Sequence, residues 1–380
     1  MIRDLDQGGS ERQCAETARW LDRSRFQAHV GAMNPYGSRA TELRTAGVPT
    51  VHLPVRSFRR PSVATAALRM GRYLSDHHIQ VVHAFDGPMT VFGMPTARLF
   101  RAPVVISSQR GHRSLMPEWM RHMLRLTDLL VDAIVVNCRA MQRHLIEEER
   151  VPPALVRLCY NGLDTARFFP APAVRPDVLR DASLVIGVVC ALRPEKDLGS
   201  LIEAFAQVRP LRPGMKLLIV GSGLLLPDLE ARTRALGVRQ DCVFQPSTAD
   251  VALWLRAIDI FVLPSLSEAL SNSLMEAMGC ACAVAASRVG GNPELVTDAQ
   301  TGLLFEPGNS RSLAAALATL VTNPELRRRV TSAATNFIHR NFSFAEAGRR
   351  MGEIYEELLE RKRSGGPQPQ RGQRGAGMCR

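Results

Sequence analysis

The sequence predicts an α/β protein made of two doubly wound domains. Short apolar segments of strand length alternate with segments of helical periodicity through both halves of the 380-residue chain. This alternation is typical of parallel sheets covered by helices. A proline-rich stretch at residues 170–176 indicates a linker between the halves. The length suits two domains of ordinary size.

In the first half, five apolar segments have the length of buried parallel strands. They are Phe26–Ala32, Thr50–Pro54, Val81–Ala84, Val104–Ser107 and Ala133–Val136. Helical patterns lie between them at Thr41–Ala46, Val63–His77, Met89–Phe100 and Ala140–Glu149. Met1–Leu5 supplies at most a stub, so the first strand of this domain is expected to be truncated.

In the second half, strands are expected at Leu184–Cys190, Lys216–Val220, Val243–Phe244, Ile258–Leu263 and Ala283–Ala285. Helical patterns occupy Leu198–Val208, Ser310–Val321, Pro324–Phe337 and Phe344–Arg363. Ligands of such domains bind beyond the carboxyl ends of the strands, so the loops at those ends are the places to look for a site.

The loop after Leu263 carries the strongest pattern of this kind. A helix is predicted to begin at Asn272, with Ser271 as its N-cap, and its free N–H groups and dipole suit a diphosphate. Glu268 and Glu276 lie on either side of the helix start and can accept hydrogen bonds from hydroxyls. A nucleoside diphosphate sugar combines these groups. The alternative is an ordinary strand–loop–helix unit with two surface glutamates.

The run S-E-x-L-x-N-x-L-x-E-A-M at Ser267–Met278, followed by an apolar strand and V-G-G-N-P-E, resembles the group 1 retaining nucleotide-sugar glycosyltransferases. The resemblance implies a GT-B fold, with two Rossmann-like domains facing a central cleft. It also implies that Glu268 lies near the donor sugar and that Glu276 holds the ribose. The amides of Leu270, Ser271 and Asn272 would then bind the diphosphate.

Other positions match the same family. Lys196 corresponds to a lysine that neutralises the donor diphosphate, and Arg193 is the neighbouring cation because Ala191 stands where the family has an arginine. Gly221 belongs to a glycine turn of the second domain. Gly8–Gly9 resembles the turn that lies beside the diphosphate in the first domain.

Gln109 stands where many members carry a histidine near the reacting sugar. Arg110 is therefore the catalytic candidate of the first domain, beside Glu268 and Lys196 of the second. His83 and His112 are candidates for the acceptor side of the site. For each of these three first-domain residues the alternative is a packed or loop position without a ligand.

The resemblance also indicates the domain bounds. We expect an N-terminal acceptor-side domain at residues 1–168 and a nucleotide-sugar-binding domain at 169–343. The helix at 344–363 is expected to cross back to the first domain, as in other GT-B proteins. Residues 364–380, rich in Gly, Pro, Gln and Arg, are expected to form a disordered basic tail.

The net charge of +12 is unevenly distributed. Residues 1–165 carry 22 basic and 15 acidic side chains, and residues 361–380 carry six basic and none acidic. An anionic partner is expected on the first half, either an anionic membrane surface or nucleic acid. Basic amphipathic segments that could lie on a membrane contain Arg56, Arg59, Arg60, Arg69 and Arg72, and Trp119 with Arg121 and Arg125. Few aromatics accompany the arginines, so specific nucleic-acid binding is not expected.

These observations predict a retaining glycosyltransferase that moves a sugar from a UDP- or GDP-linked donor to an acceptor glycan or lipid-linked saccharide. A bacterial envelope polysaccharide or glycolipid is the expected product. No metal-ligand spacing and no C-x-x-C pair occur, so no essential metal or other cofactor is expected. A cytoplasmic location is expected, peripheral on the inner face of the plasma membrane. The alternatives are a GT-B sugar-nucleotide epimerase and a non-enzymatic basic nucleic-acid-binding protein.

Overall fold

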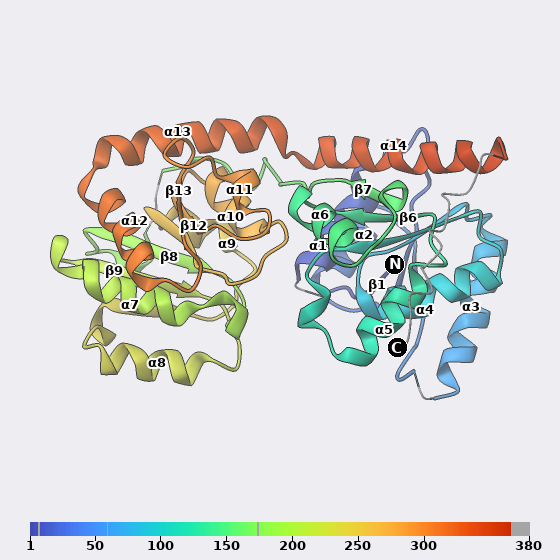
Figure 1. Cartoon of the computed structure of the whole chain (residues 1–380), viewed down its shortest axis with the longest axis horizontal. Coiled ribbons are helices and arrows are strands. Elements are labelled where there is room, and N and C mark those ends of the chain that lie inside the picture. Colours follow the sequence, from blue (N-terminus) through green and yellow to red (C-terminus); the bar gives the residue numbers. More distant parts are fainter. Residues whose placement is uncertain (7, 59, 173–174, 366–380) are drawn as a thin grey trace, which may run out of the picture. The chain divides into compact units, whose positions relative to one another are not determined.

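The computed structural model describes residues 1–6, 8–58, 60–172 and 175–365 (Figure 1). Arg59 and residues 366–380 of the expected tail lie outside these ranges. The chain forms two compact units, residues 1–162 with the segment from Phe344 onward, and Leu163–Ser343. The boundary lies after Gly162, before the expected position at residue 168. Leu163 belongs to the second unit because its N–H donates to the Phe342 carbonyl at 2.6 Å and because it pairs with Ser343.

The strands of unit 1 are all parallel and form two hydrogen-bonded groups, ordered β1-β2-β3 and β4-β5-β6-β7. Their bounds are Ile2–Asp4, Val30–Asn34, Thr50–His52, Val81–Ala84, Val104–Gln109, Ala133–Val136 and Val156–Leu158. The groups meet at Met1, whose nitrogen donates to the His83 carbonyl and whose carbonyl accepts from the Phe85 N–H at 2.9 Å. The second strand begins at Val30 and not at Phe26 as predicted.

Seven helices occur in the described part of unit 1 (Figure 1). They are α1 (Gly9–Trp20), α2 (Ser38–Thr45), α3 (Ser62–Asp76), α4 (Gly87–Leu99), α5 (Glu118–Thr127), α6 (Arg139–Glu147) and α14 (Phe344–Arg363). The last of these belongs to the core, because Ile354 and Leu358 are fully buried in a cluster with Val104 and Ile106 of β5. An apolar residue recurs every three or four positions along α14, which gives the helix one face to bury.

Unit 2 contains one six-stranded parallel sheet in the order β10-β9-β8-β11-β12-β13. The strands are β8 (Leu184–Val189), β9 (Met215–Val220), β10 (Cys242–Gln245), β11 (Ile260–Leu263), β12 (Ala283–Ser287) and β13 (Leu303–Phe305). The chain starts in the middle at β8, builds outward to β10, and returns to β11 on the other side of β8. The point between β8 and β11 is therefore the topological switch point, where doubly wound domains bind ligands.

The helices of unit 2 are α7 (Leu198–Val208), α8 (Leu226–Ala235), α9 (Val251–Arg256), α10 (Asn272–Gly279), α11 (Asn292–Leu295), α12 (Ser310–Thr322) and α13 (Pro324–Asn341). Leu201 and Phe205 of α7 pack with Leu317 of α12 on Ile260 of β11, and all four are fully buried. This core holds the carboxyl ends of the strands in place.

Short 3-10 turns lie at Arg113–Leu115 (η1), Pro153–Leu155 (η2), Asp177–Leu179 (η3), Pro194–Lys196 (η4), Arg209–Leu211 (η5) and Arg239–Asp241 (η6).

Candidate functional site

The candidate site of unit 2 is built around the start of α10, beyond the carboxyl end of β11. The helix begins at Asn272, as predicted, and the Ser271 hydroxyl accepts from the Leu274 N–H at 3.3 Å. Such a cap satisfies one of the free N–H groups of the first turn. The remaining amides and the helix dipole give this end a positive potential that favours an anion.

Lys196 and Glu268 meet beside this helix start. The Lys196 ammonium forms an ion pair with Glu268 Oε1, which also accepts from the Ser265 hydroxyl at 3.1 Å. The Leu266 N–H donates to the Glu195 carbonyl at 2.8 Å, so the backbones of the two loops are joined as well. These loops follow β8 and β11, which places the charge pair at the switch point of the sheet.

The loop before α10 also contacts the turn after β12, and this backbone contact depends on Gly290. Its φ is +51°, and a Cβ there would lie 1.9 Å from the Glu268 carbonyl oxygen. The neighbouring Gly291 N–H donates to the Ala269 carbonyl at 2.7 Å. No side chain fits at position 290 without moving the segment that carries Glu268. Gly290 had no predicted role, although it lies in the V-G-G-N-P-E run.

The other predicted residues of unit 2 lie around this loop. Glu276 sits in α10 with 3% of its surface exposed. Gly221 follows β9 with φ +155°, and a Cβ there would lie 1.8 Å from the Cys190 carbonyl oxygen. Arg193 follows β8 and projects into solvent, with 70% of its side chain exposed and Nη1 3.9 Å from Glu195. The ligand contacts expected of these three residues stay predictions.

In unit 1, Gly8 precedes α1 and Gly9 opens it. Gly8 has the extended φ of 176°, and a Cβ there would lie 2.0 Å from Glu11 Oε2. The Glu11 carboxylate therefore lies over the start of its own helix, and burial raises its pKa. The expected diphosphate contact at Gly8–Gly9 stays a prediction, and a diphosphate there would have to displace this carboxylate.

His83 is buried and both of its ring nitrogens are engaged. Nδ1 lies 2.8 Å from the Tyr355 hydroxyl and Nε2 lies 2.8 Å from the Ser108 hydroxyl. Burial lowers the pKa of His83 well below its ordinary value, so the ring stays neutral. These bonds tie β4, β5 and α14 together. These contacts agree with the packed alternative for His83, and its expected place on the acceptor side stays a prediction.

Arg110 and His112 follow β5. Arg110 donates to the Asn161 side-chain oxygen at 2.8 Å and its guanidinium lies 5.5 Å from the centre of the Phe85 ring. Burial lowers the pKa of Arg110 to about 10. His112 is half-buried with its ring 4.6 Å from that of His144, and burial first and the neighbouring histidine second lower its pKa. The catalytic role expected of Arg110 and the acceptor-side role expected of His112 stay predictions.

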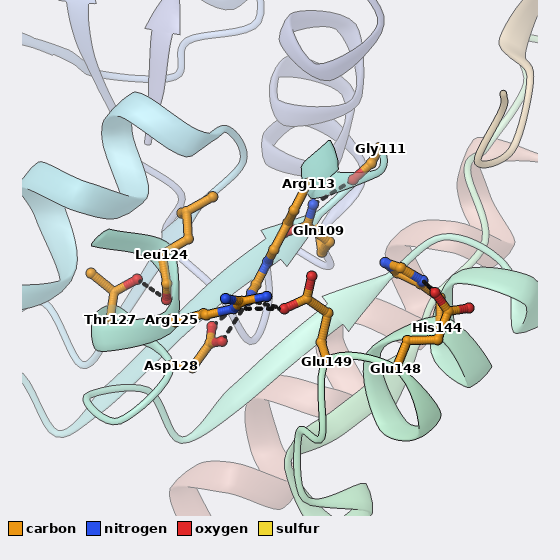
Figure 2. A network of polar contacts seen from close by, with 10 residues as sticks. All are labelled: Gln109, Gly111, Arg113, Leu124, Arg125, Thr127, Asp128, His144, Glu148 and Glu149. Atoms are coloured by element: carbon orange, nitrogen blue, oxygen red, sulfur yellow. Dashed lines mark hydrogen bonds and ion pairs between the residues drawn. The ribbon is translucent and has the colours of Figure 1, made fainter. Parts of the chain in front are cut away.

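A buried arginine without a predicted role organises the same loop (Figure 2). Arg113 is 2% exposed and donates to both carboxylate oxygens of Asp128, at 2.7 and 2.9 Å. Its Nε donates to Gln109 Oε1 at 3.1 Å. Glu149 lies 3.9 Å from Arg113 and 3.0 Å from Arg125. Gln109 thus serves the loop itself, and a cavity of about 190 Å³ lies beside it.

Two family descriptions match the chain. Residues 7–167 match Glycosyltransferase Family 4 and residues 174–337 match Glycosyl transferases group 1. A relative from Corynebacterium glutamicum is 31% identical over 279 residues, which cover 69% of this chain and 72% of the relative. It is a GDP-mannose-dependent monoacylated alpha-(1-6)-phosphatidylinositol monomannoside mannosyltransferase. The chain belongs to the group 1 glycosyltransferases of the family 4 type.

A second relative and two solved structures are also similar to the chain. A GDP-mannose-dependent alpha-(1-6)-phosphatidylinositol monomannoside mannosyltransferase of Mycolicibacterium smegmatis is 27% identical over 318 residues, 79% of this chain and 82% of the relative. The structure of Anabaena HepE with UDP-glucose has a TM-score of 0.81 at 21% identity, covering 94% of this chain and 99% of HepE. Sucrose-phosphate synthase of Thermosynechococcus elongatus has a TM-score of 0.79 at 18% identity, covering 94% and 96%. The predicted GT-B fold is confirmed.

Two properties of this glycosyltransferase hold for the described residues. Within these ranges, no group of three or more His, Cys, Asp or Glu side chains is arranged to hold a metal ion. No helix in the described part of the chain is both long and apolar enough to cross a bilayer.

Gly290→Ala tests the backbone contact at the site. A left-handed φ costs an alanine about 1–2 kcal/mol, and the clash with the Glu268 carbonyl adds about 1–3 kcal/mol. The matched control is Gly237→Ala, which has φ +66° and nothing within 4 Å of the added Cβ. Urea unfolding followed by circular dichroism should show the larger loss for Gly290→Ala. Equal losses would mean that the contact with Glu268 is unimportant.

Arg113→Met tests the buried ion pair. Removing one partner leaves the Asp128 carboxylate, which is only 14% exposed, without its main counter-charge, and this costs about 3–5 kcal/mol of unfolding free energy. The double variant Arg113→Met, Asp128→Leu replaces the pair by apolar groups and should recover most of that loss, as measured by urea unfolding. If the double variant is as unstable as Arg113→Met, the ion pair is not the main contribution of Arg113 to the free energy of unfolding.

Proposed function

We propose that this glycosyltransferase is a retaining enzyme whose nucleotide-sugar donor binds in unit 2 at the start of α10. The observation that carries the proposal is the capped helix start with the Lys196–Glu268 pair beside it, at the switch point of the sheet. A diphosphate would accept from the amides of Leu270, Ser271 and Asn272. The ribose hydroxyls would donate to the Glu276 carboxylate.

The Lys196–Glu268 pair suits a donor that carries both hydroxyls and phosphate. The two side chains are 20% and 12% exposed, so neither charge is fully solvated. We propose that the sugar hydroxyls take the place of Lys196 at Glu268 while the ammonium turns to the diphosphate. When the sugar–phosphate bond breaks, negative charge grows on the departing diphosphate, and a cation and amides already in place stabilise it. The exposed side chain of Arg193 supplies a second cation for the diphosphate.

The proposed acceptor is a lipid-linked saccharide of a bacterial envelope. The relatives from Corynebacterium and Mycolicibacterium named above are mannosyltransferases that act on phosphatidylinositol monomannosides, and both depend on GDP-mannose. GDP-mannose is therefore the first donor to test, followed by the UDP-sugars. Transfer with retention would leave the anomeric configuration of the donor unchanged, which proton NMR of the product measures directly.

Glu276→Gln tests the donor site. Loss of hydrogen bonds from the ribose to a charged carboxylate costs about 1.5–3 kcal/mol, so calorimetry should show affinity for the preferred nucleoside diphosphate falling by roughly tenfold to a hundredfold. The wild type should discriminate against the 2′-deoxy nucleotide and the variant should not. Glu325→Gln, at an exposed position of α13, is the matched control. Unchanged affinity and discrimination in Glu276→Gln would contradict the proposal.

We also propose that unit 1 lies on an anionic membrane surface. Trp119 of α5 is 50% exposed and Phe58 is 39% exposed, and their ring centres lie 6.1 Å apart. Leu115 and Leu126, on either side of Trp119 in the sequence, are 57% and 58% exposed. Arginines that neighbour this apolar group in the sequence, such as Arg56, are exposed as well. Aromatic rings with arginines around them suit the headgroup region of a bilayer.

The double variant Phe58→Ala, Trp119→Ala tests this membrane contact. Sedimentation with vesicles rich in phosphatidylglycerol at low salt should show the variant binding several-fold more weakly than the wild type, because apolar area that enters the interface is lost. Leu224→Ala in unit 2, where Leu224 is 97% exposed, is the matched control and should bind as the wild type does. If the variant and the control bind equally, the membrane contact lies elsewhere.

A further inference from the structure

The cavity beside Gln109 contains an arginine whose charge the described residues do not balance. The cavity has a volume of about 190 Å³, room for roughly six water molecules at about 30 Å³ each. It lies beyond the carboxyl ends of β4 and β5, and Ser10 of α1 and Gly87 at the start of α4 also line it. Arg110, the first residue after β5, belongs to its wall. The proposed donor site of unit 2 gives this cavity no role.

The other charged side chains in the wall of the cavity have their partners. Arg113 donates to both carboxylate oxygens of Asp128, at 2.7 and 2.9 Å (Figure 2). Asp86 accepts from the Arg3 N–H at 2.7 Å and from the Met89 N–H at 2.8 Å. Each of these charges is therefore compensated by an ion or by oriented amides.

Arg110 differs from them because it has no carboxylate partner. Its guanidinium donates to the neutral side-chain amide of Asn161 at 2.8 Å, and the Phe85 ring centre lies 5.5 Å away. No Asp or Glu of the described ranges forms an ion pair with it. A guanidinium carries five N–H donors, so donors remain for a ligand in the cavity.

The titratable groups that act most strongly on Arg110 are neutral at pH 7. They are the thiols of Cys14 and Cys159 and the phenol of Tyr355. Burial raises the pKa of Cys159 to about 11, and it raises the pKa of Cys14 and that of Tyr355 as well. Burial also lowers the pKa of Arg110, yet only to about 10, so the guanidinium keeps its charge at pH 7.

A ligand that brings an anion would complete this arrangement. A charge removed from water costs free energy unless it is paired and hydrogen-bonded. A guanidinium matches the planar carboxylate and the phosphate, to which it can donate two parallel N–H bonds. The proposed donor diphosphate already has the Lys196 ammonium and the amides at the start of α10 in unit 2. The anion at Arg110 is therefore assigned to the acceptor.

We propose that this cavity binds an acidic group of the saccharide acceptor, a phosphate or a carboxylate, and that Arg110 selects for it. The inference rests on the proposed function, because it takes the acceptor to be a saccharide. A neutral acceptor would leave Arg110 without a counter-ion, so the enzyme would discriminate against it. In this role Arg110 binds the acceptor, which differs from the catalytic role predicted from the family pattern.

Thermal unfolding of the full chain tests the binding without any donor. Glucose 6-phosphate, glucuronate and glucose present similar rings with a phosphate, a carboxylate or no charge. At constant ionic strength, at least one of the two acids should raise the unfolding midpoint of the wild type by a few degrees, and glucose should not. Arg110→Gln should lose most of this shift, and Arg110→Lys should keep part of it because the charge remains.

Arg143→Gln, at an exposed position of α6, is the matched control and should respond to the acids as the wild type does. Without ligand, Arg110→Gln should unfold at the wild-type midpoint or above it, because it removes a charge that has no partner. A midpoint lower by many degrees would mean that Arg110 is structural and would overturn the proposal. No shift with either acid, or a shift that Arg110→Gln retains, would overturn it as well.

Calorimetry with the preferred nucleoside diphosphate separates this inference from the donor site. Arg110→Gln should bind the nucleotide as the wild type does, whereas Glu276→Gln should bind it more weakly. A loss in Arg110→Gln as large as that in Glu276→Gln would assign the anion to the donor and overturn the inference. If Glu276→Gln binds the nucleotide normally while the acids still act through Arg110, the donor site is wrong and the acid site stands.

Discussion

Contact between backbones at the carboxyl ends of the unit 2 strands is the constraint on which the candidate site depends. Gly290 lets the turn after β12 approach the Glu268 carbonyl, and Gly221 lets the turn after β9 approach the Cys190 carbonyl. Neither approach leaves room for a Cβ. The first contact holds the loop before α10, which carries Glu268, and the second holds the segment after β8 that leads to Lys196, so backbone contacts support both members of the Lys196–Glu268 pair. A site that must bind a charged leaving group benefits from such preorganisation.

Unit 1 is organised by polar groups that are buried and satisfied. Arg113 joins η1 to the end of α5 through Asp128, and His83 joins β4 and β5 to α14 through Ser108 and Tyr355. Buried charges and imidazoles of this kind are costly unless their partners are in place, so they specify one arrangement of the loops. The loop after β5 is therefore held by its own side chains.

Much of the fold could be predicted from the sequence, because apolar runs and helical periodicity report local structure directly. The start of α10 at Asn272 was predicted from Ser271 and the polar loop before it, and the structure shows that cap. The ion pair of Lys196 with Glu268 was not predicted, since it joins loops that only the sheet order brings together. In the sequence, nothing distinguishes Arg113 from the other arginines of the basic first half. Its burial depends on Asp128 and Gln109 meeting it in three dimensions.

The first half shows which contacts the sequence pattern does not contain. His83 lies near the end of β4, and Tyr355 of α14, from the far end of the chain, engages its ring. β2 begins at Val30, opposite Thr50 at the start of β3, because a strand forms only where a neighbour pairs with it. The ring contact of His83 and the pairing of β2 both join separate segments of the chain. The apolar periodicity of a single segment does not reveal such contacts.

A crystal structure of the protein with the nucleoside diphosphate that it binds most tightly tests the central claim most directly. The account predicts diphosphate oxygens within hydrogen-bond distance of the amides of Leu270–Asn272, with the ribose hydroxyls on the Glu276 carboxylate. It also predicts that the Lys196 ammonium moves from Glu268 towards the diphosphate. A nucleotide bound away from α10, with the Lys196–Glu268 pair unchanged, would contradict it.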